Sequence, residues 1–329
     1  MKRQRSQLIE DMKLKKLPFT SLSAPLLCIG LIACSSTRAS LEVAPSPTVT
    51  PQSKACSSTT LRQQIEEIAR TTGGPVGVAV TLLESDDVVK INGQQKFPMQ
   101  SVYKLPIGMA VLQQIDQGKL KLEQKVAIDP KEYVRIGMHS PIRDKHPRGA
   151  ELPLSELLRL SVSESDGTAS DVLMRTAGGA AVVQKYLLDL GINGMMVLDT
   201  EKEIGKNVDV QYRNWATPEG ALALLKVVAE GRSLSAASHK KLLEFMTETQ
   251  TGLKRIKGEL PAGALVAHKT GTGFSQGLTR AVNDIGLVTL PDGRRLAIAV
   301  FVSDTKLEPE ACEAVIAKIS RAAWDCWTN

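Results

Sequence analysis

The sequence has few of the residues that mark a metal centre, and it lacks the patterns of several elongated folds. Its 329 residues include four histidines and five cysteines, with no CxxC pair and no histidines at ligand spacing. We therefore expect no metal and no cofactor, because metal sites need clustered ligands. Heptads, internal repeats and long charge runs are also missing, which excludes coiled coils and solenoids. The composition, 43% hydrophobic and 23% charged, is that of a globular protein.

A strong excess of one charge is absent from most of the chain. The formal net charge is +6, but the first 33 residues hold six of the 41 basic side chains and two of the 35 acidic ones. The rest of the chain is therefore nearly neutral, and it carries no basic stripe. We expect no nucleic-acid partner, because such proteins need a concentrated positive surface.

The start of the chain has the pattern of an export signal. A basic stretch ending at Lys16 precedes an apolar run at residues 26–33, which is too short to span a bilayer stably. We expect a signal peptide at 1–33 and a flexible tether, rich in Ser, Thr and Pro, at 34–58. The protein is then periplasmic or secreted.

The end of this signal resembles a bacterial lipobox. The run Leu31-Ile32-Ala33-Cys34 would make Cys34 the lipidated first residue, anchored to the outer membrane. An ordinary cleaved signal with an incidental Cys34 is the alternative. Met12 would make a tidier start than Met1, so the true start codon stays open.

Three cysteines follow Cys34. Cys312 and Cys326 fall on one expected helix, about 21 Å apart along its axis, so they cannot bridge each other. Cys56 could pair with Cys326 if the terminal helices pack antiparallel. This pairing is a hypothesis that thiol counting by mass spectrometry would test.

Helical and strand-like patterns alternate in three blocks along the chain. A helix at 59–72 precedes a hairpin made by residues 76–83 and a strand from Val88. The middle of the chain is helical, and strands return late, before a final helix. Further helices are expected at 105–117, 152–162, 168–176, 180–190, 218–230, 237–248 and 309–327, and late strands at 265–269, 282–290 and 296–302.

This order predicts an α/β (α+β) fold in which the two ends of the chain build one antiparallel sheet. Terminal helices cover one face, and a helical block is inserted between the two sets of strands. A cleft should form where the helical block meets the sheet edge, which is a favoured place for a small-molecule site.

Ser101 and Lys104 are the first candidates for chemistry. They are three residues apart at the start of a helix, so the amine can lie beside the hydroxyl on one face. A serine needs a neighbouring base to become a nucleophile, and a helix N-terminus offers N–H groups to a developing oxyanion. The pair is weak evidence alone, because Ser238 and Lys241 repeat the spacing on what we interpret as a solvated helix surface.

Two further motifs strengthen the assignment by their order. Ser165-Asp166-Gly167 lies 64 residues after Ser101, and Lys269-Thr270-Gly271 lies 104 residues after Ser165, in an apolar strand. Glycine on an edge strand allows close approach of a substrate, and lysine can meet a substrate carboxylate. An S-x-x-K motif followed by these elements is typical of serine β-lactamases and penicillin-binding proteins.

From about residue 59 to its end, the chain resembles a class A serine β-lactamase, nearest the branch of the PER and VEB extended-spectrum enzymes. The resemblance implies a five-stranded antiparallel sheet beside an all-helical region. It divides the catalytic region 59–329 into a sheet domain, 59–98 with 256–329, and a helical domain, 99–255. The segments that carry the likeness include 100–106, 211–215, 260–263 and 266–272.

The resemblance also implies roles for the site residues. Ser101 attacks the lactam carbonyl, with backbone N–H groups of Ser101 and Thr272 as the oxyanion hole. Ser165 relays a proton to the lactam nitrogen with help from Lys104, and Glu201 activates the deacylating water. Whether Lys104 or Glu201 is the base for acylation stays open. The substrate-binding set is Lys269, Thr270, Gly271, Thr272, Gly167 and Arg255, although Arg255 is equally well interpreted as a surface residue.

Several positions depart from the usual family pattern. Gly167 replaces an asparagine that contacts substrate, which would remove a hydrogen bond and widen the site. Gly205 stands where an asparagine commonly helps to hold the deacylating water, and Asp171 replaces a further asparagine. Asp199 and Asn214 fill positions of a common Arg–Asp pair. The efficiency of deacylation is therefore open.

The function that the sequence predicts is hydrolysis of β-lactam antibiotics through a serine acyl-enzyme, by a protein that is expected to be a monomer. One alternative is a penicillin-binding DD-peptidase, against which Glu201 argues. Another is a lipoprotein that binds β-lactams or peptidoglycan without turnover. The preferred β-lactams cannot be predicted from the sequence.

Overall fold

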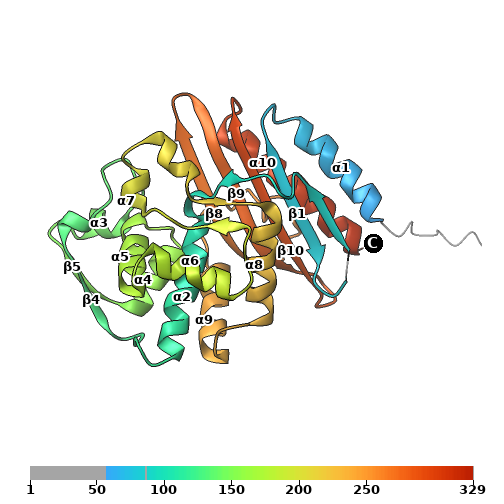
Figure 1. Ribbon diagram of the computed structural model, residues 1–329. Helices are drawn as coiled ribbons and strands as arrows, with labels where there is room; N and C mark the ends of the chain where they lie inside the picture. Colours follow the sequence, from blue (N-terminus) through green and yellow to red (C-terminus); the bar gives the residue numbers. More distant parts are fainter. Residues whose placement is uncertain (1–56, 86, 329) are drawn as a thin grey trace, which may run out of the picture. The chain divides into compact units, whose positions relative to one another are not determined.

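The computed structural model describes residues 57–85 and 87–328 (Figure 1). Its main sheet has five antiparallel strands in the order β2-β1-β10-β9-β8. The predicted fold class is confirmed, because the strands from the two ends of the chain form one sheet. The strands are β1 (Val76–Leu82), β2 (Val88–Ile91), β8 (Leu265–Ser275), β9 (Leu278–Thr289) and β10 (Arg295–Thr305).

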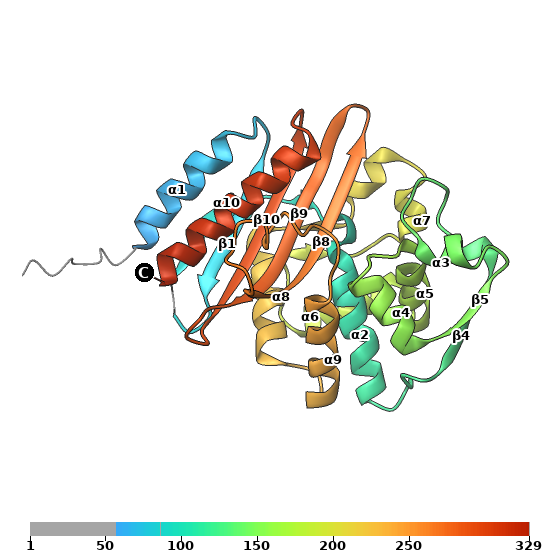
Figure 2. The same ribbon diagram turned by 180° about the vertical axis from the view of Figure 1, so that it is seen from behind.

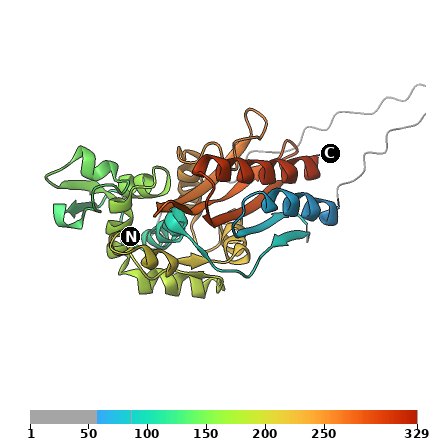
Figure 3. The same cartoon turned by 90° about the horizontal axis from the view of Figure 1, so that it is seen from above.

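Both faces of this sheet are covered. The terminal helices α1 (Ser58–Arg70) and α10 (Pro309–Thr328) run antiparallel on one face, side by side in all three views (Figures 1, 2 and 3). Aliphatic side chains of β1, β9 and β10, among them Val78 and Val300, pack with them in one hydrophobic cluster. The alternate side chains of the same strands face α8 (Pro218–Glu230) and the helical part of the molecule in a second cluster. Because successive side chains of a strand point to opposite faces, the same strands contribute to both hydrophobic cores.

The helical part is arranged around α2 (Lys104–Asp116), which is buried without interruption from Lys104 to Leu112. Such a helix needs apolar neighbours on all sides, and α4, α5, α6 and α9 supply them. Asp166 caps the start of α5 by accepting a hydrogen bond from the backbone of Ala169. These helices span Leu154–Val162 (α4), Gly167–Ala177 (α5), Ala180–Asp189 (α6) and Ala236–Thr247 (α9).

Several short elements have no counterpart among the sequence predictions. They are too short to show periodicity, and three of them, η1, α7 and η3, carry residues that line the site. They are β3 (Phe97–Pro98), η1 (Gln100–Tyr103), β4 (Lys125–Ile128), η2 (Pro130–Glu132), α3 (Pro141–Lys145), β5 (Ala150–Pro153), β6 (Met195–Met196), α7 (Glu201–Ile204), η3 (Val208–Tyr212) and β7 (Trp215–Ala216).

The sequence predictions for the signal peptide, the lipid anchor on Cys34 and most of the tether lie outside the described residues, as does Cys56. Cys312 and Cys326 both lie on α10, as expected; Cys312 is a free buried thiol and Cys326 is disulfide-bonded. In the part of the chain that the structure describes, no helix is long and apolar enough to cross a membrane.

Candidate active site

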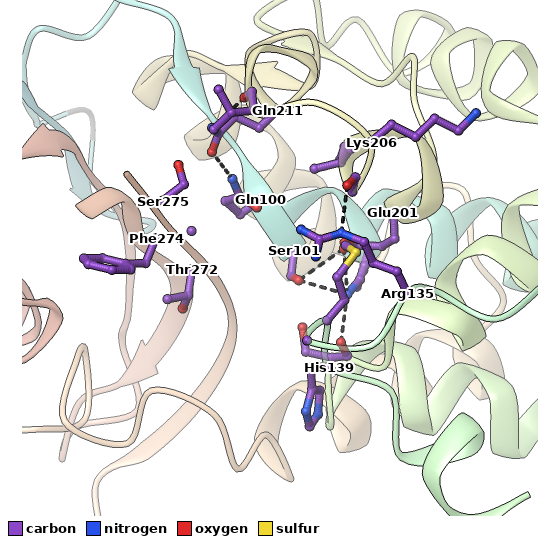
Figure 4. Close-up of a pocket in the computed structure, with 18 of the residues that line it drawn as sticks. Gln100, Ser101, Arg135, His139, Glu201, Lys206, Gln211, Thr272, Phe274 and Ser275 are labelled. Atoms are coloured by element: carbon purple, nitrogen blue, oxygen red, sulfur yellow. Dashed lines mark hydrogen bonds and ion pairs between the residues drawn. The ribbon is translucent and has the colours of Figure 1, made fainter. Parts of the chain in front are cut away.

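A cleft of about 610 Å³ opens where the edge strand β8 meets the helical part, as the topology predicts (Figure 4). Ser101, Lys104, Ser165 and Glu201 line it together with Thr270 and Thr272 of β8. Four segments that are distant in the sequence therefore meet here. The remaining wall comes from Arg135 and residues 137–139, from α7 with the loop that follows it, and from the end of β8.

Ser101 lies in the 3₁₀ turn η1, directly before α2. The residue in front of it, Gln100, has φ 47°, a left-handed conformation that bends the chain into this turn. The amide of Gln100 donates to Gln211 Oε1 at 2.6 Å, which ties the nucleophile segment to η3. This hydrogen bond could not be predicted from the sequence, because the two residues are 111 positions apart and meet only in the folded structure.

Lys104 connects the nucleophile to the two other polar segments. Its Nζ lies 2.9 Å from Ser101 Oγ, 2.7 Å from the Ser165 carbonyl oxygen and 2.9 Å from Glu201 Oε1. Lys104 is only 2% exposed, so these three acceptors satisfy an ammonium that water does not reach. Ser101 Oγ is also 3.5 Å from Glu201 Oε1. Both candidate bases for acylation are therefore near the hydroxyl, with Lys104 the closer.

Ser165, which also lines the cleft, is held in a strained backbone conformation, with φ 62°. Its hydroxyl accepts a hydrogen bond from Lys269 Nζ at 3.0 Å. Lys269 is fully buried. Burial lowers the pKa of Lys269 well below its usual value, and the nearby Lys104 ammonium lowers it further. A proton on Lys269 is thus more easily given up than on an exposed lysine.

Glu201 begins α7, and Asp171 of α5 fixes that end of the helix. The Asp171 carboxylate accepts hydrogen bonds from the backbone N–H groups of Glu201 at 2.7 Å and Lys202 at 2.9 Å. Burial raises the pKa of Asp171 to about 7, and the neighbouring Glu201 carboxylate raises it too. Asn214 holds the chain just before α7, since its side-chain oxygen accepts from the backbone of Leu198 and Asp199.

Arg255 is buried, so the interpretation as a surface residue is wrong. It is 4% exposed, and its guanidinium donates to the carbonyl oxygens of Gly271 and Asn283 and to Thr272 Oγ1 at 2.7 Å. Glu313 on α10 neutralises it at 3.0 Å. Thr270 and Thr272 line the cleft, whereas Arg255 and Lys269 do not. Arg255 lies behind Thr272, to which it donates a hydrogen bond.

Gly271 has a packing role that the sequence interpretation did not foresee. A Cβ on this residue would lie 2.3 Å from the carbonyl oxygen of Met99, just before the nucleophile turn. The absence of a side chain therefore lets β8 lie directly against the Ser101 segment, and Gly271 does not line the cleft.

The expectation that Gly167 widens the site is wrong. A Cβ at this position would lie 3.2 Å from Val134 Cγ1 and 3.3 Å from the His139 carbonyl oxygen, so neighbouring groups already fill the space. Gly167 is buried and does not line the cleft. The contact with residues 134–139 could not be predicted from the sequence, because this packing partner lies about 30 positions before Gly167.

The second S-x-x-K copy is also not a simple solvated surface. Ser238 is buried on α9, where its hydroxyl donates to Asp116 Oδ1 at 2.7 Å, and Lys241 pairs with Glu244. The two side chains are thus engaged with Asp116 of α2 and Glu244 of α9. Ser238 therefore serves the packing of α9 against α2.

No group of three or more His, Cys, Asp or Glu side chains that could hold a metal ion occurs within the described ranges. His268, whose strand position is as expected, is fully buried and pairs through Nδ1 with Asp284 at 2.9 Å.

Comparison with known proteins gives consistent matches over this whole region. A profile described as "Beta-lactamase enzyme family" matches residues 60–327. The chain is 42% identical over 267 residues to the extended-spectrum β-lactamase PER-1 of Pseudomonas aeruginosa, which covers 80% of this chain and 86% of that protein. It is 38% identical over 272 residues to β-lactamase VEB-1 of the same organism, covering 82% and 91%.

Solved structures agree with the sequence matches. A β-lactamase from Chitinophaga pinensis is similar with a TM-score of 0.79 and 48% identity, over 82% of this chain and 99% of that one. The TLA-1 extended-spectrum β-lactamase is similar with a TM-score of 0.80 and 38% identity, over 83% and 99%.

Proposed function

The chain belongs to the class A β-lactamases, and on that premise we propose that it opens the β-lactam ring in two steps, with Ser101 as nucleophile and Glu201 as the base for deacylation. The activity is hydrolysis of β-lactam antibiotics, which gives resistance to them. One observation carries the assignment of residues: Lys104 Nζ lies 2.9 Å from both Ser101 Oγ and Glu201 Oε1.

In the first step, Ser101 Oγ forms a bond to the lactam carbonyl carbon while its proton passes to a base. Lys104 Nζ can accept this proton once the ammonium has passed one of its own to Glu201, 2.9 Å away, and Glu201 itself is the second candidate base. The backbone N–H groups of Ser101 and Thr272 would stabilise the oxyanion. The C–N bond then breaks, and the nitrogen takes the proton of the Ser165 hydroxyl. The proton taken from Ser101 passes through Lys104 to Ser165, which leaves the Lys104–Glu201 ion pair as it began, while Lys269 holds the Ser165 hydroxyl through a 3.0 Å hydrogen bond.

In the second step, a water molecule attacks the ester carbonyl carbon and gives its proton to Glu201. The bond to Ser101 Oγ breaks, and the oxygen regains a proton from the Lys104 network. The hydroxyls of Thr270 and Thr272 would bind the substrate carboxylate, with the positive charges of Lys269 and Arg255 behind them.

Hydrolysis of a chromogenic cephalosporin, combined with intact-mass spectrometry, tests this assignment. The parent should turn over, Ser101→Ala should form no covalent adduct, and Glu201→Ala should accumulate an acyl-enzyme. Ser238→Ala is the matched control from the second S-x-x-K copy and should keep turnover. A parent that is acylated once without turnover would instead be a penicillin-binding peptidase or a binding protein.

Further parts of the proposal concern the chain outside the cleft. We infer export from the cytoplasm with a lipid on Cys34, a monomeric state, and a division into a sheet domain (59–98 with 256–329) and a helical domain (99–255). A Cys34→Ser variant that leaves the membrane fraction and no longer incorporates labelled palmitate would support the anchor.

A further inference from the structure

Residues 134–139 lie against the two glycines that flank Glu201 in space. Gly167 is the first residue of α5, and Gly205 is the residue that follows α7. Each of them faces side chains or backbone of this one segment. A Cβ at Gly205 would lie 2.6 Å from Met138 Sδ, and a Cβ at Gly167 would lie 3.2 Å from Val134 Cγ1. The segment therefore occupies the room that both missing side chains leave.

The backbone at Gly205 does not require glycine. Its φ is −68° and its ψ is −15°, a conformation that any residue adopts. The obstacle to a side chain there is the thioether of Met138, which is partly buried and lines the cleft. The Met138 side chain thus occupies the space that a side chain at position 205 would need.

Hydrogen bonds fix the same segment to the elements that carry the site. Arg135 Nε donates to the Gly205 carbonyl oxygen at 2.8 Å, and Arg135 lies beside Glu201 in the cleft (Figure 4). At the other end, the Gly167 N–H donates to the His139 carbonyl oxygen at 2.9 Å. The His139 ring bonds to the Glu164 carbonyl oxygen, also at 2.9 Å.

These contacts hold α7 from the end opposite Asp171. The helix has only four residues, so its own hydrogen bonds cannot keep it in place. Asp171 fixes the N-terminal end of α7, while Arg135 and Met138 fix its C-terminal end at Gly205. Glu201 lies on α7 between these two anchored ends, with its carboxylate 2.9 Å from Lys104.

We propose that Met138 and Arg135 are positioning residues for Glu201. The Met138 thioether fills the volume beside Gly205, and this contact holds α7 in place. This inference rests on the proposed role of Glu201 in deacylation. Met138 does not touch the reacting atoms; it acts through the position of α7.

The experiment measures acylation and deacylation separately, by stopped-flow absorbance and quenched mass spectrometry with a slowly hydrolysed cephalosporin. Met138→Ala should slow deacylation by about tenfold or more. Met138→Leu, which restores most of the volume, should stay within about threefold of the parent. Ile136→Ala is the control from the same segment, since Ile136 is 87% exposed, and should leave both rates unchanged.

Two double variants separate this role from a general loss of stability. Gly205→Ala should slow deacylation without slowing acylation, because the new methyl group collides with Met138. Adding Met138→Ala should restore part of the deacylation rate, because the methyl group then has room. In a Glu201→Ala background, Met138→Ala should cause no further loss.

Deacylation that is unchanged in Met138→Ala, or a loss that persists with Glu201 removed, would overturn the inference. The absence of turnover in the parent would instead overturn the proposed function. An acyl-enzyme trapped by Glu201→Ala together with normal Met138→Ala kinetics would leave the function standing and reject only the role of Met138.

Discussion

Lys104 Nζ and Glu201 Oε1 form an ion pair of 2.9 Å in which both side chains are buried. Removing one partner leaves the other charge without compensation, which costs about 3–5 kcal/mol for a buried pair. We therefore expect Lys104→Met to abolish acylation and to lower the free energy of unfolding by an amount of this order. The Lys104→Met/Glu201→Gln double variant should be more stable than Lys104→Met alone. Chemical denaturation and burst-phase kinetics measure the two effects.

Lys269 should impose an alkaline limit on substrate binding. Its pKa is lowered by burial and by Lys104, so the ammonium loses its proton at a lower pH than an exposed lysine would. Once it is neutral, the carboxylate of a β-lactam loses an attractive charge, and KM should rise with pH while KM on the acid side stays flat. Steady-state kinetics across this range check the sign. A Lys269→Arg variant, whose guanidinium stays charged, should show no such rise.

Asp171 should make the protein less stable as the pH rises toward neutrality. Its pKa is raised from 3.8 to about 7, so between these values the folded protein binds a proton that the unfolded chain does not. The stabilisation is present below pH 3.8 and is lost as pH rises through about 7, at about 1.4 kcal/mol per pKa unit. Asp171→Asn cannot titrate, so its free energy of unfolding should fall less over this interval. Denaturant titrations at several pH values measure the difference in unfolding free energy between the parent and Asp171→Asn. A difference that does not change with pH would contradict this role of Asp171.

Arg255 should affect both stability and binding. Arg255→Ala removes donors to Gly271, Asn283 and Thr272 and leaves Glu313 without its partner. We expect a loss of about 2–4 kcal/mol in unfolding free energy and a raised KM, because the Thr272 hydroxyl is no longer held. Arg255→Lys should not restore the parent, since an ammonium cannot span these acceptors.

The matched control for this change is Arg321→Ala, which breaks an exposed pair with Asp325. Surface pairs contribute about 0–1 kcal/mol, so this variant should be close to the parent in both measurements. Equal losses in the two arginine variants would contradict a special role for Arg255.

The long elements could be predicted from the sequence because each has its own periodicity. Residues 309–327 were expected to be a helix and α10 spans Pro309–Thr328, and the predicted hairpin appears as β1 and β2. The order of Ser101, Ser165 and Lys269 likewise predicts one cleft, and the structure places them together.

What the sequence could not predict depends on contacts between distant segments. A glycine at position 167 predicts open space because it has no side chain, whereas Val134 and His139 fill that space. The sequence cannot predict whether Arg255 is buried, because its burial depends on β8, β9 and α10 together. The four-residue helix α7 has no periodic signal, so neither this helix nor the contact of Met138 with Gly205 could be predicted.

The pairing of β1 with β10 governs how this chain can reach its folded state. Val78 pairs with Val300, so strands made early have to wait for residues synthesised more than 200 positions later. Closing so long a loop is slow, and until β10 arrives both β1 and β9 present open edges to other chains. A ribosome-bound fragment that ends before β10 therefore cannot complete the sheet, and it is the species most exposed to aggregation and proteolysis.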